Sequence, residues 1–293
     1  MSSFPLFPAA AERRPVVSAA LKSSSLIWER LSAVPKLTDV RLASRLEARP
    51  APEMVSSGIR EMDALTGGLP RGCLTEVCGA ASSGRTSMLL AALAAATQRQ
   101  EACTLVDVSD AFDPVSAAAA GVDFERLLWI RCGVRDKIRH QERDCSRAPE
   151  GKKRKLAEGP VEQALRVTDL LLQSGGFGLV MIDFGDVPFQ TARRIPLTSW
   201  FRFQRAVERT STVLFVITPA PCAQTCASLL LKVSGKKLSA ISCQLSAHAR
   251  APVVATHTQL LDGIHVEGEL LRSRLERKPV GSATFTTKAA RIG

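Results

Sequence analysis

The sequence predicts an α/β protein in which a mostly parallel sheet is flanked by helices. Segments of strand and helix character alternate from Gly58 onward. The strand candidates are continuous apolar runs rather than alternating ones, so both faces of the sheet are expected to be covered. A glycine-rich stretch, GAASSGRTS at 79–87, stands between a predicted strand and a predicted helix, which is the context of a phosphate-binding loop.

The strands and helices of this core follow from apolar runs and their punctuation. The expected buried strands are Leu74–Cys78, Cys103–Val108, Leu127–Cys132, Gly178–Asp183 and Thr212–Thr218. The expected helices run from the glycine-rich stretch to about Gln98, and over Pro114–Gly121, Val161–Leu172 and Ser199–Arg209. Antiparallel strands that extend the sheet are expected at Ser228–Val233, Ala240–Leu245, Gly263–Leu271 and Ser282–Thr286.

The chain is expected to have four parts. Residues 1–15 are Pro-punctuated and predicted to be disordered, and 16–50 hold an amphipathic N-terminal helix and a linker. The α/β core covers 51–230 and contains a charge-rich insertion at 135–159, where KKRK stands at 152–155. Residues 231–293 form a C-terminal β extension and a tail expected to bind a partner.

The amino-acid composition indicates which classes of partner and site are expected. The formal charge of +11 and the pI near 9.6 favour an anionic partner, either DNA or a protein with an acidic face, although a solvated basic surface would give the same numbers. Aromatic residues make up 5% and tyrosine is absent, so a surface of stacked aromatic rings is not expected. The eight cysteines contain no C-x-x-C pair, and no apolar run reaches the length of a membrane span. We expect a cytoplasmic protein, associated with the nucleoid, without a metal site.

The glycine-rich stretch carries the clearest chemistry. Consecutive backbone N–H groups and the N-terminus of the following helix would point at one place, and glycines let the backbone approach phosphate oxygens. Thr86 takes the position of the hydroxyl that holds Mg²⁺, and Asp183, at the end of a buried strand, is the second candidate anchor of the ion. The candidate nucleotide-binding residues are Gly79, Ser82, Ser83, Gly84, Arg85, Thr86, Ser87, Asp113 and Asp183.

Longer stretches resemble the RecA recombinase superfamily over roughly residues 55–220. They are SSGIREMDALTGGLPRGCLTEVCGAASSGRTS at 56–87, VDVSDAFDPVSAAAAGVDFERLLWI at 106–130 and LVMIDF at 179–184. Within that superfamily, the FPLFP start and the RSRLERKPVGSATF tail resemble the ImuA family of accessory proteins from bacterial mutagenesis cassettes. The resemblance implies a RecA-like core.

The resemblance also exposes four departures at nucleotide-handling positions. Arg85 replaces the loop lysine, and a planar guanidinium does not substitute for a compact ammonium between phosphates. Ser109 stands where the recombinases have the glutamate that activates water, and losing a general base costs on the order of 10²–10⁴ in rate. Ser116 replaces the aromatic residue that lies against adenine, and Thr218–Pro219 replaces the nucleotide-sensing glutamine.

These departures predict a non-catalytic adaptor with no catalytic residue and with no cofactor or only weak ATP and Mg²⁺ binding. The resemblance implies partners in SOS-induced translesion synthesis: an inactive Y-family polymerase homologue, an error-prone replicative-type polymerase and the RecA filament. The first alternative is an ATP-dependent recombinase paralogue that acts through Arg85 and Asp110. The second is a cell-division inhibitor of the SOS response.

DNA contact is expected to be weak and nonspecific. The connection Gly185–Thr198, which stands where recombinases carry a DNA-binding loop, is short but contains Arg193 and Arg194. Other basic groups occur at KKRK 152–155, at Lys232, Lys236 and Lys237, and at Arg272, Arg274, Arg277 and Lys278. At the N-terminus, Phe4, Leu6 and Phe7 resemble a sliding-clamp-binding peptide, against the alternative of a plain disordered tail.

Overall fold

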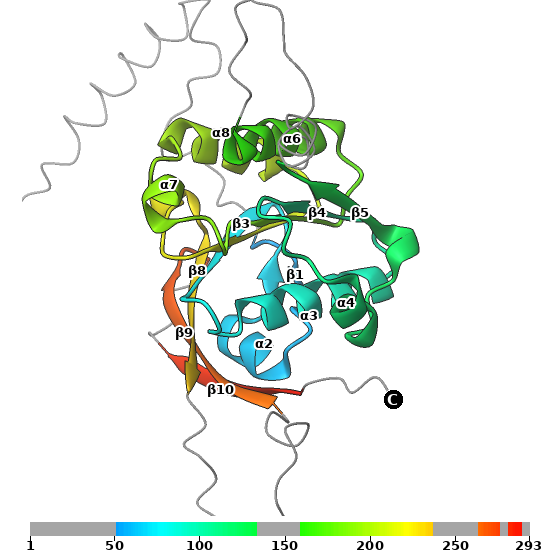
Figure 1. Cartoon of the computed structure of the whole chain (residues 1–293), viewed down its shortest axis with the longest axis vertical. Coiled ribbons are helices and arrows are strands. Elements are labelled where there is room, and N and C mark those ends of the chain that lie inside the picture. Colours follow the sequence, from blue (N-terminus) through cyan, green and yellow to red (C-terminus); the bar gives the residue numbers. More distant parts are fainter. Residues whose placement is uncertain (1–50, 134–158, 237–262, 276–280, 289–293) are drawn as a thin grey trace, which may run out of the picture. The chain divides into compact units, whose positions relative to one another are not determined.

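The computed structural model of the chain describes residues 51–133, 159–236, 263–275 and 281–288 (Figure 1). These residues lie within one compact unit, Ala51–Gly293. The expected helix and linker at 16–50, the strand at Ala240–Leu245, KKRK 152–155, Lys237, Arg277, Lys278 and the clamp-like residues Phe4, Leu6 and Phe7 lie outside the described residues.

The main element is an eight-stranded sheet in the order β10-β9-β8-β3-β7-β6-β4-β5. Every pair from β8 to β5 is parallel, whereas β9 is antiparallel to β8 and β10 is antiparallel to β9. The strands are β3 Cys73–Cys78, β4 Cys103–Asp107, β5 Leu127–Arg131, β6 Leu179–Asp183, β7 Val213–Thr218, β8 Leu229–Lys236, β9 Gly263–Ser273 and β10 Ser282–Lys288. The predicted mostly parallel sheet with a C-terminal antiparallel extension is confirmed.

Helices cover both faces of the sheet, as the continuous apolar strands require. In Figure 1, α2, α3 and α4 lie on one side and α6 and α8 on the other. The helices are α2 Arg60–Thr66, α3 Arg85–Gln98, α4 Pro114–Ala119, α6 Pro160–Ser174, α7 Phe189–Arg193 and α8 Leu197–Val207, with 3₁₀ turns η3 Phe124–Arg126 and η4 Gln224–Cys226. A small separate sheet pairs β1 Met54–Val55 with β2 Leu69–Pro70.

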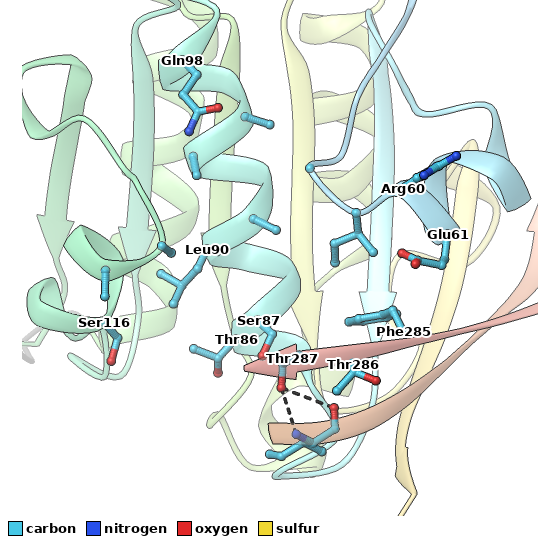
Figure 2. Close-up of a pocket in the computed structure, with 18 of the residues that line it drawn as sticks. Arg60, Glu61, Thr86, Ser87, Leu90, Gln98, Ser116, Phe285, Thr286 and Thr287 are labelled. Atoms are coloured by element: carbon cyan, nitrogen blue, oxygen red, sulfur yellow. Dashed lines mark hydrogen bonds between the residues drawn. The ribbon is translucent and has the colours of Figure 1, made fainter. Parts of the chain in front are cut away.

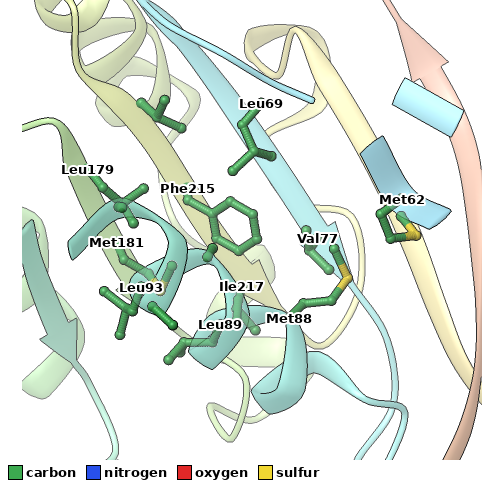
Figure 3. Packing of buried hydrophobic residues seen from close by; sticks show 14 of the residues in the cluster. Met62, Leu69, Val77, Met88, Leu89, Leu93, Leu179, Met181, Phe215 and Ile217 are labelled. Atoms are coloured by element: carbon green, nitrogen blue, oxygen red, sulfur yellow. The ribbon is translucent and has the colours of Figure 1, made fainter. Parts of the chain in front are cut away.

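Two apolar cores form on the two faces. The first packs α3 against the sheet through Met88, Leu89 and Leu93, which contact side chains such as Phe215 and Met181 (Figure 3). The second packs α6 and α8 against the opposite face and contains Trp200 and Phe203, both fully buried. Residues along one strand alternate between the cores, which places Val77 in the first and Leu74 in the second.

One prediction about pairing was incomplete. The run Ser228–Val233 was expected to start the antiparallel extension, but β8 pairs parallel with β3 on one side and antiparallel with β9 on the other. The parallel pairing is possible because residues 219–228 cross over β3 before β8 begins. β8 therefore belongs to the parallel core, and it spans the boundary that was expected between residues 230 and 231.

Candidate functional site

The phosphate-loop stretch follows β3, as the sequence predicts, and leads into α3. The backbone N–H of Gly79, at the start of the loop, donates a hydrogen bond of 3.2 Å to the carbonyl of Thr218, the last residue of β7. Gly84, the N-cap of α3, has φ 93°, a left-handed conformation that glycine adopts without strain. A Cβ on Gly84 would lie 2.4 Å from Cγ2 of Val266, because β9 passes directly against the loop.

The guanidinium of Arg85 reaches the segment that follows β6, beside the candidate magnesium anchor Asp183. Its side chain is 8% exposed, and its Nη1 donates a 2.7 Å hydrogen bond to the carbonyl of Gly185. Its Nη2 lies 3.5 Å from Oδ1 of Asp186. A Cβ on Gly185 would lie 3.3 Å from Cζ of Arg85 and 2.8 Å from Oδ1 of Asp183, so a glycine is needed at this contact. The guanidinium is thus held by Gly185 and Asp186, in the turn between β6 and α7.

Asp183 ends β6 beside Asp107, which is its register partner on β4. Its Oδ1 accepts a hydrogen bond of 2.7 Å from the backbone N–H of Gly185. Burial raises the pKa of Asp183 to about 6, helped by the charges of Asp107 and Asp186 and opposed by the Gly185 hydrogen bond and by Arg85. The predicted magnesium anchor is therefore a carboxyl group whose negative charge is disfavoured by burial, although it remains mostly ionised at neutral pH.

The position of the lost general base lies just after β4. Asp107 accepts hydrogen bonds from the backbone N–H groups of Ala111 and Phe112 at 3.1 and 3.0 Å, which ties down the turn that contains Ser109. Asp110, the alternative base, forms a two-pronged ion pair with Arg131 at 2.6 and 2.9 Å. A carboxylate held by a guanidinium is a weaker base than a free one. This arrangement does not favour proton transfer by Asp110.

Asp113 serves as a helix cap. Its carboxylate accepts hydrogen bonds from the backbone N–H groups of Val115 and Ser116 at 3.1 and 3.0 Å, and from the Ser116 hydroxyl. These bonds lower the pKa of Asp113 and start α4 at Pro114, as expected for aspartate before proline. Asp113, a candidate nucleotide-binding residue, and Ser116, at the position of the adenine-stacking aromatic, are therefore hydrogen-bonded to each other at the start of α4.

A groove of about 760 Å³ runs along the outer side of α3, between α4 and β10 (Figure 2). Thr86 and Ser87 line one end and Gln98 the other, and Ser116 lies on the α4 side. The α3 wall carries Leu90 and small side chains, and α2 adds the charged residues Arg60 and Glu61 to the lining. The alanines in the lining are Ala91, Ala94, Ala95, Ala119 and Ala120. Of the candidate nucleotide-binding residues, the groove contains Thr86 and Ser87 but not Arg85. It also contains Ser116, which stands at the position of the lost adenine-stacking aromatic.

Sequence reasoning missed Glu76, which is completely buried on β3. Its carboxylate accepts hydrogen bonds from the Thr218 hydroxyl at 3.0 Å and from the backbone N–H groups of Cys222 and Ala223 at 2.6 and 3.2 Å. Burial raises its pKa above the usual value, opposed by these bonds. Glu76 therefore fixes the crossover between β7 and β8. The signal was a single acid inside the apolar run LTEVC.

The predicted DNA-contact residues Arg193 and Arg194 are not among the residues that line the groove. Arg193 ends α7 and Arg194 follows it, and both side chains are exposed. Among the other basic groups, Lys232 is exposed on β8, and Arg272 on β9 donates to the carbonyl of Gln224. Lys232 is the register partner of Cys78, the residue directly before the phosphate loop, so this basic group lies beside the loop.

Within the described ranges, no cluster of three or more His, Cys, Asp or Glu side chains is placed to hold a metal ion. Cys222 and Cys226 are both buried and carry free thiols. None of the described helices combines the length and the apolar character that crossing a bilayer requires.

Comparison with known proteins bears on this geometry. The RecA N-terminal domain matches residues 39–134. This part of the chain is similar in sequence to the N-terminal domain of RecA. A relative, Protein RecA from Ectopseudomonas oleovorans, is 32% identical over 133 residues, which is 45% of this chain and 31% of the relative. The chain thus covers about a third of the length of that relative, and the matches support a relationship to the RecA superfamily at the level of the core.

Proposed function

We propose that this chain is a non-catalytic RecA-like adaptor that recruits or bridges components of translesion synthesis during SOS-induced DNA repair, as its resemblance to the ImuA family suggests. The observation that carries the proposal is the buried Arg85 guanidinium, bonded to the Gly185 carbonyl at 2.7 Å. The residue that should neutralise phosphates is used instead to fix the chain itself.

Two further contacts support the loss of hydrolysis. Asp110, the nearest alternative base, is paired with Arg131 at 2.6 Å, and Ser109 cannot accept a proton at neutral pH. The Thr218 hydroxyl, at the nucleotide-sensing position, is buried and donates to Glu76. Arg85, Asp110 and Thr218 thus each have a partner within the protein.

The proposed partners follow from the same resemblance: an inactive Y-family polymerase homologue, an error-prone replicative-type polymerase and the RecA filament, with weak nonspecific DNA binding. Co-sedimentation of the purified chain with RecA-coated single-stranded DNA tests the filament contact. Loss of co-sedimentation on removal of residues 1–45 would assign it to the N-terminal segment, and unchanged binding would reject that assignment.

The ATPase test uses the full chain with and without single-stranded DNA. We expect ATP turnover at background, with no difference between the wild type and Asp183→Ala. The double variant Arg85→Lys with Ser109→Glu is the matched control, because it restores both recombinase-type residues. Turnover that single-stranded DNA stimulates and Asp183→Ala abolishes would contradict the adaptor and favour an ATP-dependent recombinase paralogue.

That alternative has one observation in its favour. The strand–loop–helix geometry is retained, and Thr86, the residue at the Mg²⁺ position, remains exposed at the start of α3. A titration with a fluorescent ATP analogue separates binding from hydrolysis, since weak binding without turnover fits the adaptor.

A further inference from the structure

The outer surface of α7 and α8 is apolar at its centre and basic at both ends. Phe189, Leu197 and Phe201 are 43%, 38% and 48% exposed. Leu197, Phe201 and Arg205 are spaced at i, i+4 and i+8, which places them on one stripe of α8. We call Phe189, Arg193, Arg194, Leu197, Phe201 and Arg205 the α7–α8 surface.

The orientation of this stripe is fixed by the opposite side of α8. Trp200 and Phe203 are fully buried there and stack edge-on, with ring centroids 6.0 Å apart. The ion pair between Arg202 and Asp169 ties α8 to α6 at 2.7 Å. Because α8 cannot rotate without exposing its aromatic core, Leu197 and Phe201 are presented to the outside as a rigid stripe.

In the part of the chain that the structure describes, two of the three arginines of the α7–α8 surface have no carboxylate partner, and the third has only a long contact. Among the described residues, no carboxylate lies within ion-pair distance of Arg193 or Arg194. Arg205 has only a loose contact of 3.9 Å with Glu208, and its side chain is 81% exposed. The positive charge around the apolar stripe is therefore free to attract an acidic ligand.

We infer that the α7–α8 surface docks an acidic amphipathic helix of a partner protein. Leu197 and Phe201 would contact the apolar face of that helix, and the three arginines would meet its acidic flanks. Exposed phenylalanine with surrounding arginine is the composition of an interface centre, where a few such residues carry most of the binding energy. This inference rests on the proposed function, since it names the kind of partner that an adaptor would bind.

Single-stranded nucleic acid fits the surface less well. Nucleic-acid sites combine a groove along the phosphate backbone with aromatic rings for base stacking. Here a leucine, which cannot stack on a base, occupies the stripe one helical turn from Phe201, and a helix face is convex. Apolar area framed by charge matches an amphipathic helix better than a strand of bases.

The test uses the full chain and a fluorescein-labelled synthetic helix with glutamates on its flanks and leucines on its other face. Fluorescence anisotropy should show saturable binding that Phe201→Ala and Arg205→Glu each weaken at least about tenfold. The matched controls are Phe124→Ala, a phenylalanine that is 44% exposed on η3, and Arg60→Glu, an exposed arginine of α2. The controls should change Kd by less than about twofold.

Several outcomes would overturn the inference. A scrambled peptide of the same composition could bind equally well, or the control variants could weaken binding as much as the surface variants. A labelled oligothymidylate could bind through Phe201 and Arg205 more tightly than the peptide, which would assign the surface to nucleic acid. Sedimentation of the chain alone could show a dimer that Phe201→Ala dissolves, which would assign the surface to a second copy.

ATP turnover measured on the same preparations keeps the two proposals separate. Turnover at background with no peptide binding rejects only the docking surface. Peptide binding together with DNA-stimulated turnover rejects only the non-catalytic function.

Discussion

The phosphate-loop end of the sheet and the α7–α8 surface treat charge in opposite ways. At the phosphate loop, Arg85 is bonded to Gly185 and lies near Asp186, while Arg131 holds Asp110. On the α7–α8 surface, Arg193 and Arg194 are exposed, without a carboxylate in ion-pair reach among the described residues. The arginines that are exposed to a ligand therefore lie on the α7–α8 surface, whereas Arg85 of the phosphate-loop motif is used within the protein.

The largest expected effect on stability concerns Glu76 on β3, the strand that leads into the phosphate loop. Glu76→Ala would leave three buried donors without an acceptor, and we expect a loss of about 3–5 kcal/mol in the free energy of unfolding. Glu76→Gln keeps one acceptor oxygen and should cost less. Urea denaturation of both variants measures the difference, and an Ala variant as stable as the Gln variant would contradict the role of the carboxylate.

The Glu76 contacts also show where sequence reasoning ends. The bounds of β3, β4, β5, β6 and β7 were predicted to within one residue because each is a continuous apolar run. The partners of Glu76 lie 142 to 147 residues later in the chain, and those of Arg85 lie about 100 residues away. No local pattern encodes such pairs. The parallel pairing of β8 with β3 was missed for the same reason, since a strand's composition does not specify which edge it joins.

A second test concerns the charge of Asp183, whose pKa is about 6 in the folded protein against an ordinary 3.8. Between these two pH values the native state holds more protons than the unfolded state, so stability falls as pH rises through this window. Above about pH 6 the buried charge costs about 2–3 kcal/mol. Asp183→Asn should remove that cost, because its amide oxygen can still accept from Gly185.

The measurement is the free energy of unfolding of Asp183→Asn and of the wild type at several pH values. The gain should be full at pH 8 and should vanish near pH 4. Glu125→Gln is the control, since Glu125 is exposed on η3 and does not contribute to the pKa shift of Asp183. A gain that does not depend on pH would show that burial is not the cause of the shift.

Arg85→Ala should be intermediate in effect. It removes a buried hydrogen bond from a charged group to the Gly185 carbonyl, worth about 1.5–3 kcal/mol. Because Arg85 lowers the pKa of Asp183, that pKa should rise further in the variant, which carboxyl NMR titration can measure. Arg60→Ala, at an exposed position, should change stability by less than about 0.5 kcal/mol. Equal effects at both arginines would mean that Arg85 is not part of the folded framework.

The smallest expected effect on stability concerns Phe201 on the α7–α8 surface. Phe201→Ala should lower the free energy of unfolding by only about 1 kcal/mol, because the residue is 48% exposed and buries about half of its surface. Phe203→Ala, two residues later and fully buried, should cost about 3–5 kcal/mol. Thermal unfolding of both variants checks this contrast. A phenylalanine that contributes little to stability and is held outward on a helix beside exposed arginines leaves binding as the property that its replacement should change.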